Sequence, residues 1–168
     1  MKEVWTHSMD GFPWTKNKMT KAIEILRPNA TITFAFGYEK VLVLEILNEI
    51  VFKVRPDLIL HVWSVASDHV ITEQEIEYLN KMNYVNKLHV NAYLNKFLDL
   101  SKMKQLISLK LWGKNKLDIS FLSNLKSLKE ISLTGKFSSL NSIKDCTELE
   151  FIYLSTTIDS FDFFKGLN

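Results

Sequence analysis

Cysteine, glycine and proline are scarce in this sequence of 168 residues. The single cysteine, Cys146, excludes an internal disulfide framework and a metal site with several cysteine ligands. The lack of disulfides fits a reducing compartment. Five glycines and three prolines exclude a collagen-like or linker-rich chain, and 46% apolar with 24% charged residues excludes a disordered one. The composition is typical of one compact domain.

Arginine is also scarce, since only Arg27 and Arg55 stand among the 21 basic residues. Arginine is the side chain best suited to bidentate recognition of phosphates and bases, so a dedicated nucleic-acid reader is not expected. The formal net charge of +2 is unevenly distributed. The stretch 87–144 holds 11 lysines against three acidic residues, which leaves nucleic-acid binding through this stretch, with Trp112 stacking on bases, as the alternative function.

No long apolar run is present. The longest one, residues 41–54, is interrupted by Glu45, Glu49 and Lys53 and is shorter than the ~20 apolar residues that span a bilayer. The first 13 residues contain no apolar segment of the kind that directs secretion. We therefore expect a cytoplasmic protein that does not contact a membrane.

What the sequence does contain is an internal repeat of large apolar residues at offsets 0, 3 and 5. Its copies are Val85-Leu88-Val90, Leu106-Leu109-Leu111, Leu128-Ile131-Leu133 and Leu149-Ile152-Leu154, with central residues 21, 22 and 21 positions apart. Residues two apart lie on one face of a strand. One short strand cannot bury that face alone, so stacked repeats predict a parallel sheet over a continuous core. The short connections at 117–125 and 138–146 predict single helical turns or 3₁₀ pieces.

Longer units precede these repeats. Strands are expected at 30–36 and around Leu60-x-Val62, with helices at 39–53 and after Thr72, where Thr72 and Glu75 form a capping box. An amphipathic helix at 16–26 is expected to cap the N-terminal end. We therefore expect a single domain over residues 1–168, with a cap at 1–30, two long strand–helix units at 31–84 and four short repeats at 85–168.

The pattern L-x-x-L-x-L with a period of 21–22 residues resembles the leucine-rich repeat family, in particular the short bacterial type found in internalins. The resemblance is clear over 106–124, 128–145 and 149–167 and weaker over 85–100. It implies an α/β solenoid with a curved parallel β-sheet on the concave face, helices and 3₁₀ turns on the convex face, and a concave surface that binds another protein. The family's usual turn asparagine is replaced by Tyr93, Lys114, Lys136 and Thr157. The main-chain polar groups of the turn at these positions must therefore form their hydrogen bonds with other partners.

Residues between and beside the inward leucines are expected to face out of the concave sheet in three rows. The central row is Ala35, His61, His89, Lys110, Ser132 and Tyr153; the row before it is Thr33, Ile59, Lys87, Ser108, Glu130 and Phe151; the row after it is Gly37, Trp63, Asn91, Trp112, Thr134 and Ser155. From these rows we predict a partner-binding site formed by His61, Trp63, Lys87, His89, Asn91, Lys110, Trp112, Glu130, Ser132, Phe151 and Tyr153.

Four of these residues, Trp63, Trp112, Phe151 and Tyr153, are large aromatics at positions expected to meet solvent. Tryptophan and tyrosine are enriched in the energetic centres of protein interfaces. The other interpretation is that strands favour aromatics and that each ring covers a lysine stem. Lys114 and Lys136 occupy equivalent positions of adjacent repeats, and two interpretations are open for them as well. They either attract an acidic partner or discourage edge-to-edge aggregation.

Catalytic and metal-binding signals are weak. His61 and His89 fall on neighbouring strands, but no third ligand lies beside them, so we interpret them as interface residues and expect neither metal nor cofactor. Phosphate-binding loops, dinucleotide fingerprints and hydrolase motifs do not occur. Cys146 occupies an apolar repeat position and is expected in the core. No catalytic residues are expected.

The sequence therefore predicts a non-enzymatic protein-binding module. A narrower hypothesis is an inhibitor or immunity protein that neutralises a cognate toxin. Because the ends of a solenoid need covering, we expect a monomer or a weak dimer formed through the C-terminal end, near 161–164.

Overall fold

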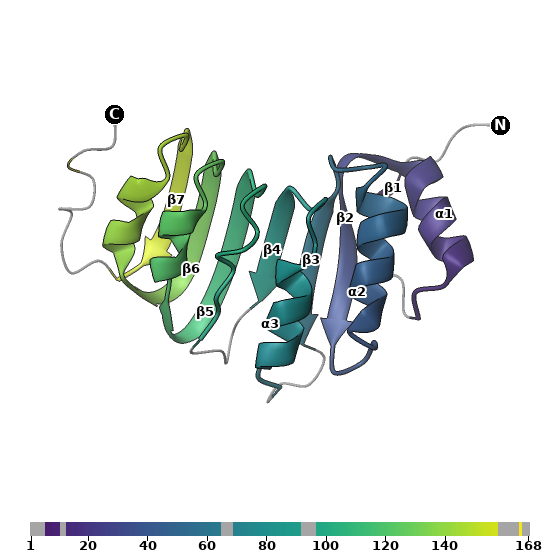
Figure 1. The fold of residues 1–168 in the computed structure, drawn as a ribbon, viewed down its shortest axis with the longest axis horizontal. Coiled ribbons are helices and arrows are strands. Elements are labelled where there is room, and N and C mark those ends of the chain that lie inside the picture. The colour runs from purple at the N-terminus through teal and green to yellow at the C-terminus, as the bar shows by residue number, and fades with distance from the viewer. Residues whose placement is uncertain (1–5, 11–12, 65–68, 92–96, 158–164, 166–168) are drawn as a thin grey trace.

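The computed structural model describes residues 6–10, 13–64, 69–91, 97–157 and 165, and it contains one parallel sheet whose seven strands follow each other in chain order (Figure 1). The strands are β1 (Thr6–Asp10), β2 (Leu26–Phe36), β3 (Ile59–Ser64), β4 (Lys87–Asn91), β5 (Ser108–Asp118), β6 (Glu130–Ser138) and β7 (Phe151–Thr156). The helical elements are α1 (Lys16–Ile25), α2 (Leu42–Leu47), the π-helix η1 (Asn48–Phe52), α3 (Glu73–Asn80) and the 3₁₀ turns η2 (Ser120–Asn124) and η3 (Leu140–Asp145).

The helices and 3₁₀ turns lie on one face of the sheet, and the strands stack side by side from the N-terminal to the C-terminal end (Figure 1). We call the other face of the sheet the concave face. This arrangement confirms the expected α/β leucine-rich repeat solenoid. The single turns expected between the last repeats are η2 and η3, and Thr72 and Glu75 form the expected capping box at the start of α3.

The repeat leucines form the core. Leu88, Leu109 and Leu133 are fully buried, and the cluster of buried residues runs without a break from Trp14 to Cys146. Burial raises the pKa of the Cys146 thiol to about 11, so the side chain is a neutral thiol that contacts the carbonyl oxygen of Leu122 (3.4 Å). Cys146 is therefore the core residue that the repeat pattern predicts. Ile152 on β7 is only partly buried, because β7 is the last strand of the sheet.

The N-terminal part contains more strand than the sequence predicts. The helix expected at 16–26 is present as α1, but β1 precedes it and pairs in parallel with β2. In β1, only Thr6 and Met9 are partly buried, so the apolar alternation that marks a strand is weak. The sheet therefore begins inside the segment that was expected to be a helical cap.

The register of β2 differs from the expected rows. Ala35 was expected beside His61, but the structure pairs Thr33 with His61 and Ala35 with Trp63. The expected row is wrong here by two residues. The reason is that the apolar residues of β2 alternate from Ala30 to Phe36, and a shift of two residues leaves every side chain on its own face. From β3 to β7 the paired residues confirm the expected rows, and the β3–β4 pairing ends at Val62–Val90, one residue before Trp63 and Asn91.

The turn that follows the repeat leucines lacks the usual asparagine, and in β5 and β6 the strands continue through it. The β5–β6 ladder continues past the repeat leucines through the Gly113–Gly135 pair and resumes at Leu117–Phe137. Main-chain pairing along this ladder supplies bonds that a turn asparagine supplies elsewhere. Tyr93, which replaces the asparagine one repeat earlier, lies outside the described residues.

Arg55 connects the end of α1 to the rest of the fold through hydrogen bonds. Its Nη1 donates to the carbonyl oxygens of Ile23 and Leu26 (2.9 Å each) at the end of α1, while Nε and Nη2 donate to the two oxygens of Asp57 (2.8 and 2.7 Å). The hydrogen bonds from Arg55 hold the pKa of the Asp57 carboxyl below its usual value. A planar guanidinium is the only basic side chain that can make all four bonds at once.

We therefore expect Arg55→Lys to lower the free energy of unfolding by about 1–2 kcal/mol, because the charge is kept while the forked geometry is lost. Urea denaturation followed by circular dichroism measures the change. Arg27→Lys is the matched control, since Arg27 is exposed on β2. Equal urea midpoints for the two variants would contradict the role given to Arg55.

Candidate functional site

The concave face carries the predicted site residues in three rows across β3 to β7. The central row is His61, His89, Lys110, Ser132 and Tyr153, and its neighbours are Ile59, Lys87, Ser108, Glu130 and Phe151 on one side and Asn91, Trp112, Thr134 and Ser155 on the other. Trp63 follows Val62 on β3 and stands at the start of the last row. Parallel pairing in constant register brings side chains from five separate repeats onto one surface.

Three rings meet at the centre of this surface. The centroids of His61 and His89 are 6.3 Å apart, and the Trp112 ring lies 6.1 Å from His61 and 6.0 Å from His89. We call these three residues the ring cluster. Since Trp112 stands on β5 and His61 on β3, the indole reaches past β4 to touch both imidazoles. The tilted and edge-on contacts are those that aromatic pairs prefer.

The imidazoles of the ring cluster are neutral at physiological pH. Burial, the Lys110 ammonium and His61 together lower the pKa of His89 to about 4. Burial also lowers the pKa of His61, against an opposing effect of the Asp10 carboxylate. The centre of the site is therefore an uncharged aromatic surface rather than a cationic one.

The ring cluster brings two imidazoles together, and the described residues place no third metal-ligating side chain beside them. The described residues contain no group of three or more histidine, cysteine, aspartate or glutamate side chains that could hold a metal ion. Glu130, the acid of the predicted site, lies two strands away from His89, and Lys110 stands between them in the rows. The arrangement is suited to packing against a flat apolar or aromatic group and to single hydrogen bonds from the imidazoles.

Asn91 adds a polar feature that the sequence does not reveal. It pairs in register with Trp112, and its amide oxygen is buried without a hydrogen-bond partner among the described residues. A buried, unsatisfied carbonyl oxygen costs free energy. Sequence reasoning places Asn91 on this face, but the lack of a donor depends on side-chain positions that the repeat pattern does not specify.

Two of the predicted aromatics, Phe151 and Tyr153, stand apart from the ring cluster. Phe151 is 59% exposed and Tyr153 is 52% exposed, both on β7. Between them and the ring cluster lies β6, which presents the small side chains Ser132 and Thr134. The structure therefore brings the predicted aromatics onto one face, with Trp112 in the ring cluster, Trp63 on β3, and Phe151 and Tyr153 together on β7.

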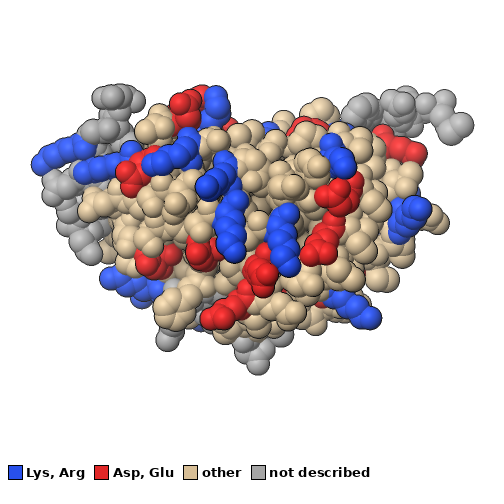
Figure 2. Space-filling view, in the orientation of Figure 1, with Lys and Arg blue, Asp and Glu red and all other residues tan. Residues whose placement is uncertain are grey.

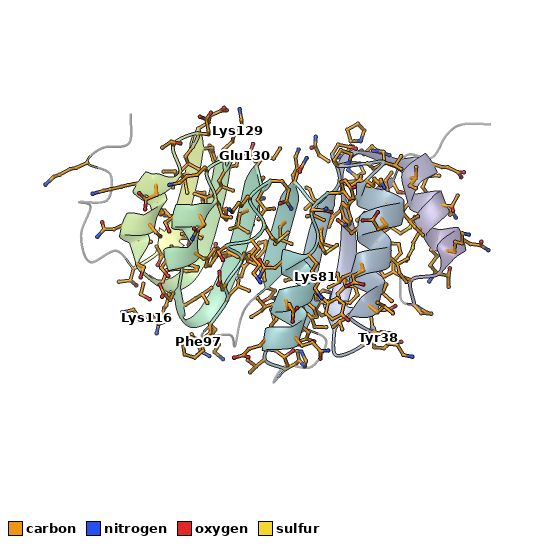
Figure 3. The ribbon with its side chains drawn as sticks, in the orientation of Figure 1. Tyr38, Lys81, Phe97, Lys116, Lys129 and Glu130 are labelled. Atoms are coloured by element: carbon orange, nitrogen blue, oxygen red, sulfur yellow. The ribbon has the colours of Figure 1, made fainter. Side chains whose placement is uncertain are left out.

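Two predicted charged residues have different surroundings. Lys110 is exposed beside the ring cluster, whereas the ammonium of Lys87 donates to the side-chain oxygen of Asn29 on β2. Glu130 is exposed at the start of β6, at the end of the sheet opposite to Phe97 and Lys116 (Figure 3). Charges thus border the aromatic centre without entering it.

A cavity of about 570 Å³ lies between α3, the segment 97–101 and η2, and the sequence does not predict it. Its lining residues are Glu73, Ile76, Phe97, Leu98, Asp99, Ser101, Asp118, Ser120, Phe121, Ser123 and Asn124. Phe97 is 80% exposed and lies at the edge where the strands end (Figure 3). These residues come from three distant segments, so a single sequence holds no signal that joins them.

Every helix in the described part of the chain is too short or too polar to cross a membrane.

Neither a protein-family model nor a curated protein matches this sequence. Among solved structures, the chain is similar to an internalin (inlF) from Listeria monocytogenes strain 4b F2365, with a TM-score of 0.51 and 20% sequence identity. The match covers 82% of this chain and 37% of the internalin. The chain therefore spans little more than a third of that protein's length, and the likeness supports the leucine-rich repeat fold.

Proposed function

We propose that this protein is a non-enzymatic binding module that holds a partner protein on the concave face of its sheet. The observation that carries this proposal is the ring cluster, in which three uncharged, half-buried rings meet on a face that the helices of the described residues leave open. A partner that covers these rings removes the rest of their apolar surface from water. Rigid aromatic side chains surrounded by polar neighbours are typical of interface centres.

The size of the face suits a protein ligand. Five strands from β3 to β7 span roughly 19 Å at the usual spacing of neighbouring strands. The ring cluster lies near one end of this span, and Phe151 with Tyr153 at the other. A helix or strand of the partner can contact both groups at once, with Ser132 and Thr134 leaving room between them.

We further propose that the module acts by occupancy in the cytoplasm, as an inhibitor or immunity protein that covers the active surface of a toxin or enzyme. The same concave residues support this narrower proposal, because a module that holds a partner on this face blocks the surface of the partner that it covers. Specificity would come from the charged neighbours, since Lys110 and Glu130 favour a partner with the complementary charges.

Nucleic acid is the competing occupant. Two lysines of 87–144 have partners within the chain, since Lys129 pairs with Glu150 (2.8 Å) and Lys126 donates to the carbonyl oxygen of Asp145 (2.8 Å). On the helical face, basic and acidic side chains are interspersed (Figure 2). This distribution favours the protein partner.

The test compares two double variants. We expect the pair Trp63→Ala and Trp112→Ala to weaken partner binding by at least about 100-fold, since an interface-centre residue contributes about 2 kcal/mol or more. The melting temperature should change little, because neither indole is part of the hydrophobic core cluster. Leu42→Ala with Ile46→Ala is the matched control, since these side chains are 52% and 41% exposed on α2, on the helical face.

Candidate partners are those captured by the wild-type chain and the α2 variant but not by the tryptophan variant. Each is then purified and titrated calorimetrically against all three proteins. Equal affinity for the tryptophan variant and the wild type would place the interface elsewhere. Capture that disappears after nuclease treatment would overturn the proposal in favour of nucleic acid.

A further inference from the structure

A hollow of about 530 Å³ lies beside the middle of β5, the second half of β6 and the end of β7. Its lining residues are Gly113, Lys114, Gly135, Lys136, Ser155, Thr156 and Thr157. Each of the first two strands contributes a Gly-Lys pair, and β7 with the residue after it contributes three hydroxyl groups. Apart from the glycines, the lining side chains among the described residues are therefore cationic or hydroxyl-bearing.

The backbone under the hollow is held in a special geometry. Gly113 pairs with Gly135, and Gly135 pairs with Thr156. Gly135 has a φ of +124°, and a Cβ at this position would stand 1.8 Å from the carbonyl oxygen of Gly113. The neighbouring strands therefore approach each other more closely than any side chain allows, and the hollow has bare main chain at its base.

The ladder next to this close approach is irregular. Between the Gly113–Gly135 pair and the Leu117–Phe137 pair, β5 has three residues where β6 has only Lys136. An extra length of strand in one partner is a bulge, and bulges redirect side chains at sheet edges and next to functional sites. The bulge of β5 begins with Lys114, so the irregularity positions one of the two lysines of the hollow.

Both lysines line the same hollow, and the described residues supply no neutralising partner for either of them. Lys114 and Lys136 follow directly after paired glycines on neighbouring strands, whose backbones lie about 5 Å apart. Neither lysine takes part in an ion pair within the described residues. Like charges placed side by side on neighbouring strands are destabilising, so an anion between them would relieve their repulsion.

We propose that this hollow binds a phosphoryl oxyanion. The ammonium groups of Lys114 and Lys136 supply point charges of the kind that hold phosphate groups, and the hydroxyls of Ser155, Thr156 and Thr157 can donate to its oxygens. The glycines let the ligand approach the main chain. A dianion matches two lysines better than a single carboxylate does, since one group then neutralises both charges.

The oxyanion site borders the concave face without depending on the partner proposed for it. Ser155 stands in the same row as Trp112 and Thr134. The ring cluster and the hollow therefore share one surface, but the hollow is built from different residues and can be tested with a free anion.

The test is a titration with inorganic phosphate, at constant ionic strength set by sodium chloride, followed by the amide resonances of Gly113 and Gly135. We expect saturable shifts at both glycines with a millimolar dissociation constant. The double variant Lys114→Gln with Lys136→Gln should weaken binding by at least about tenfold, because it removes both charges. Lys102→Gln with Lys104→Gln is the matched control, which removes the same charge from exposed lysines outside the hollow.

A second titration uses a short peptide that contains one phosphoserine. Equal affinity for the two probes identifies the free anion as a sufficient ligand, and tighter binding of the peptide identifies a phosphorylated molecule. Shifts that grow linearly with phosphate, or that are the same in both double variants, would overturn the proposal. Saturation by triglutamate but not by phosphate would also overturn it and assign the hollow to carboxylates.

Discussion

Replacing Gly135 with alanine is expected to lower the free energy of unfolding by about 3–5 kcal/mol, which is large for a single methyl group. At a φ of +124° a side chain is strained even where space is available. Here space is not available, because the new Cβ would lie 1.8 Å from the carbonyl oxygen of Gly113 and 2.7 Å from its carbonyl carbon. Main chain cannot rotate away as a flexible side chain can. The methyl group therefore forces β5 and β6 apart inside the stack of repeats.

Gly113→Ala is the matched control for this prediction. A Cβ on Gly113 would find its nearest neighbour at 3.5 Å, which is ordinary van der Waals contact. We expect this variant to stay within about 1 kcal/mol of the wild type. Urea denaturation of both variants measures the difference, and the midpoints should be well separated. Similar midpoints would show that the two strands do not approach as closely as the structure has them.

The repeat pattern predicts the rows of the concave face because its spacing is nearly constant. From β3 onwards each strand carries apolar residues two apart, and parallel pairing of those residues places His61 beside His89 and His89 beside Lys110. On β2 the same rule fails, since Ile32, Phe34 and Phe36 all alternate and the sequence does not say which two of them match Leu60 and Val62. The alternation within one strand determines which side chains face the core. The register, that is, which residues of two neighbouring strands pair, cannot be determined from the alternation of one strand alone.

The ring cluster illustrates what the pattern leaves open. Row positions follow from strand alternation, but the direction in which the Trp112 indole leans depends on side-chain packing across β4. The hollow at Gly113 and Gly135 likewise could not be predicted from the sequence. The replacement of the usual asparagine by lysine is visible in the sequence, while the close strand approach that goes with it is a three-dimensional property. The elements could be predicted from apolar spacing, and the sites depend on what happens between neighbouring repeats.

His89 is expected to make the folded protein sensitive to acid. Its pKa is about 4 in the folded chain and close to the ordinary 6.5 in the unfolded chain. Between these two values the unfolded chain binds a proton that the folded chain does not, so stability falls as the pH drops from about 6.5 to about 4 and levels off below that. The full shift corresponds to about 3 kcal/mol. Because the imidazole is partly exposed, solvent screening reduces the expected loss to about 2 kcal/mol.

Replacing His89 with phenylalanine keeps a ring in the cluster and removes the titrating group. We expect the stability of His89→Phe to depend less on pH between 6.5 and 4 than that of the wild type, while the two proteins differ little at pH 7.5. Urea denaturation at half-unit pH steps measures both curves. His7→Phe is the matched control, because His7 is exposed on β1, and its curve should parallel that of the wild type. Some pH dependence should persist in His89→Phe, since burial also lowers the pKa of His61. Parallel curves for His89→Phe and the wild type would show that the ring cluster does not hold this imidazole away from water, and the uncharged centre proposed for the binding face would be lost with it.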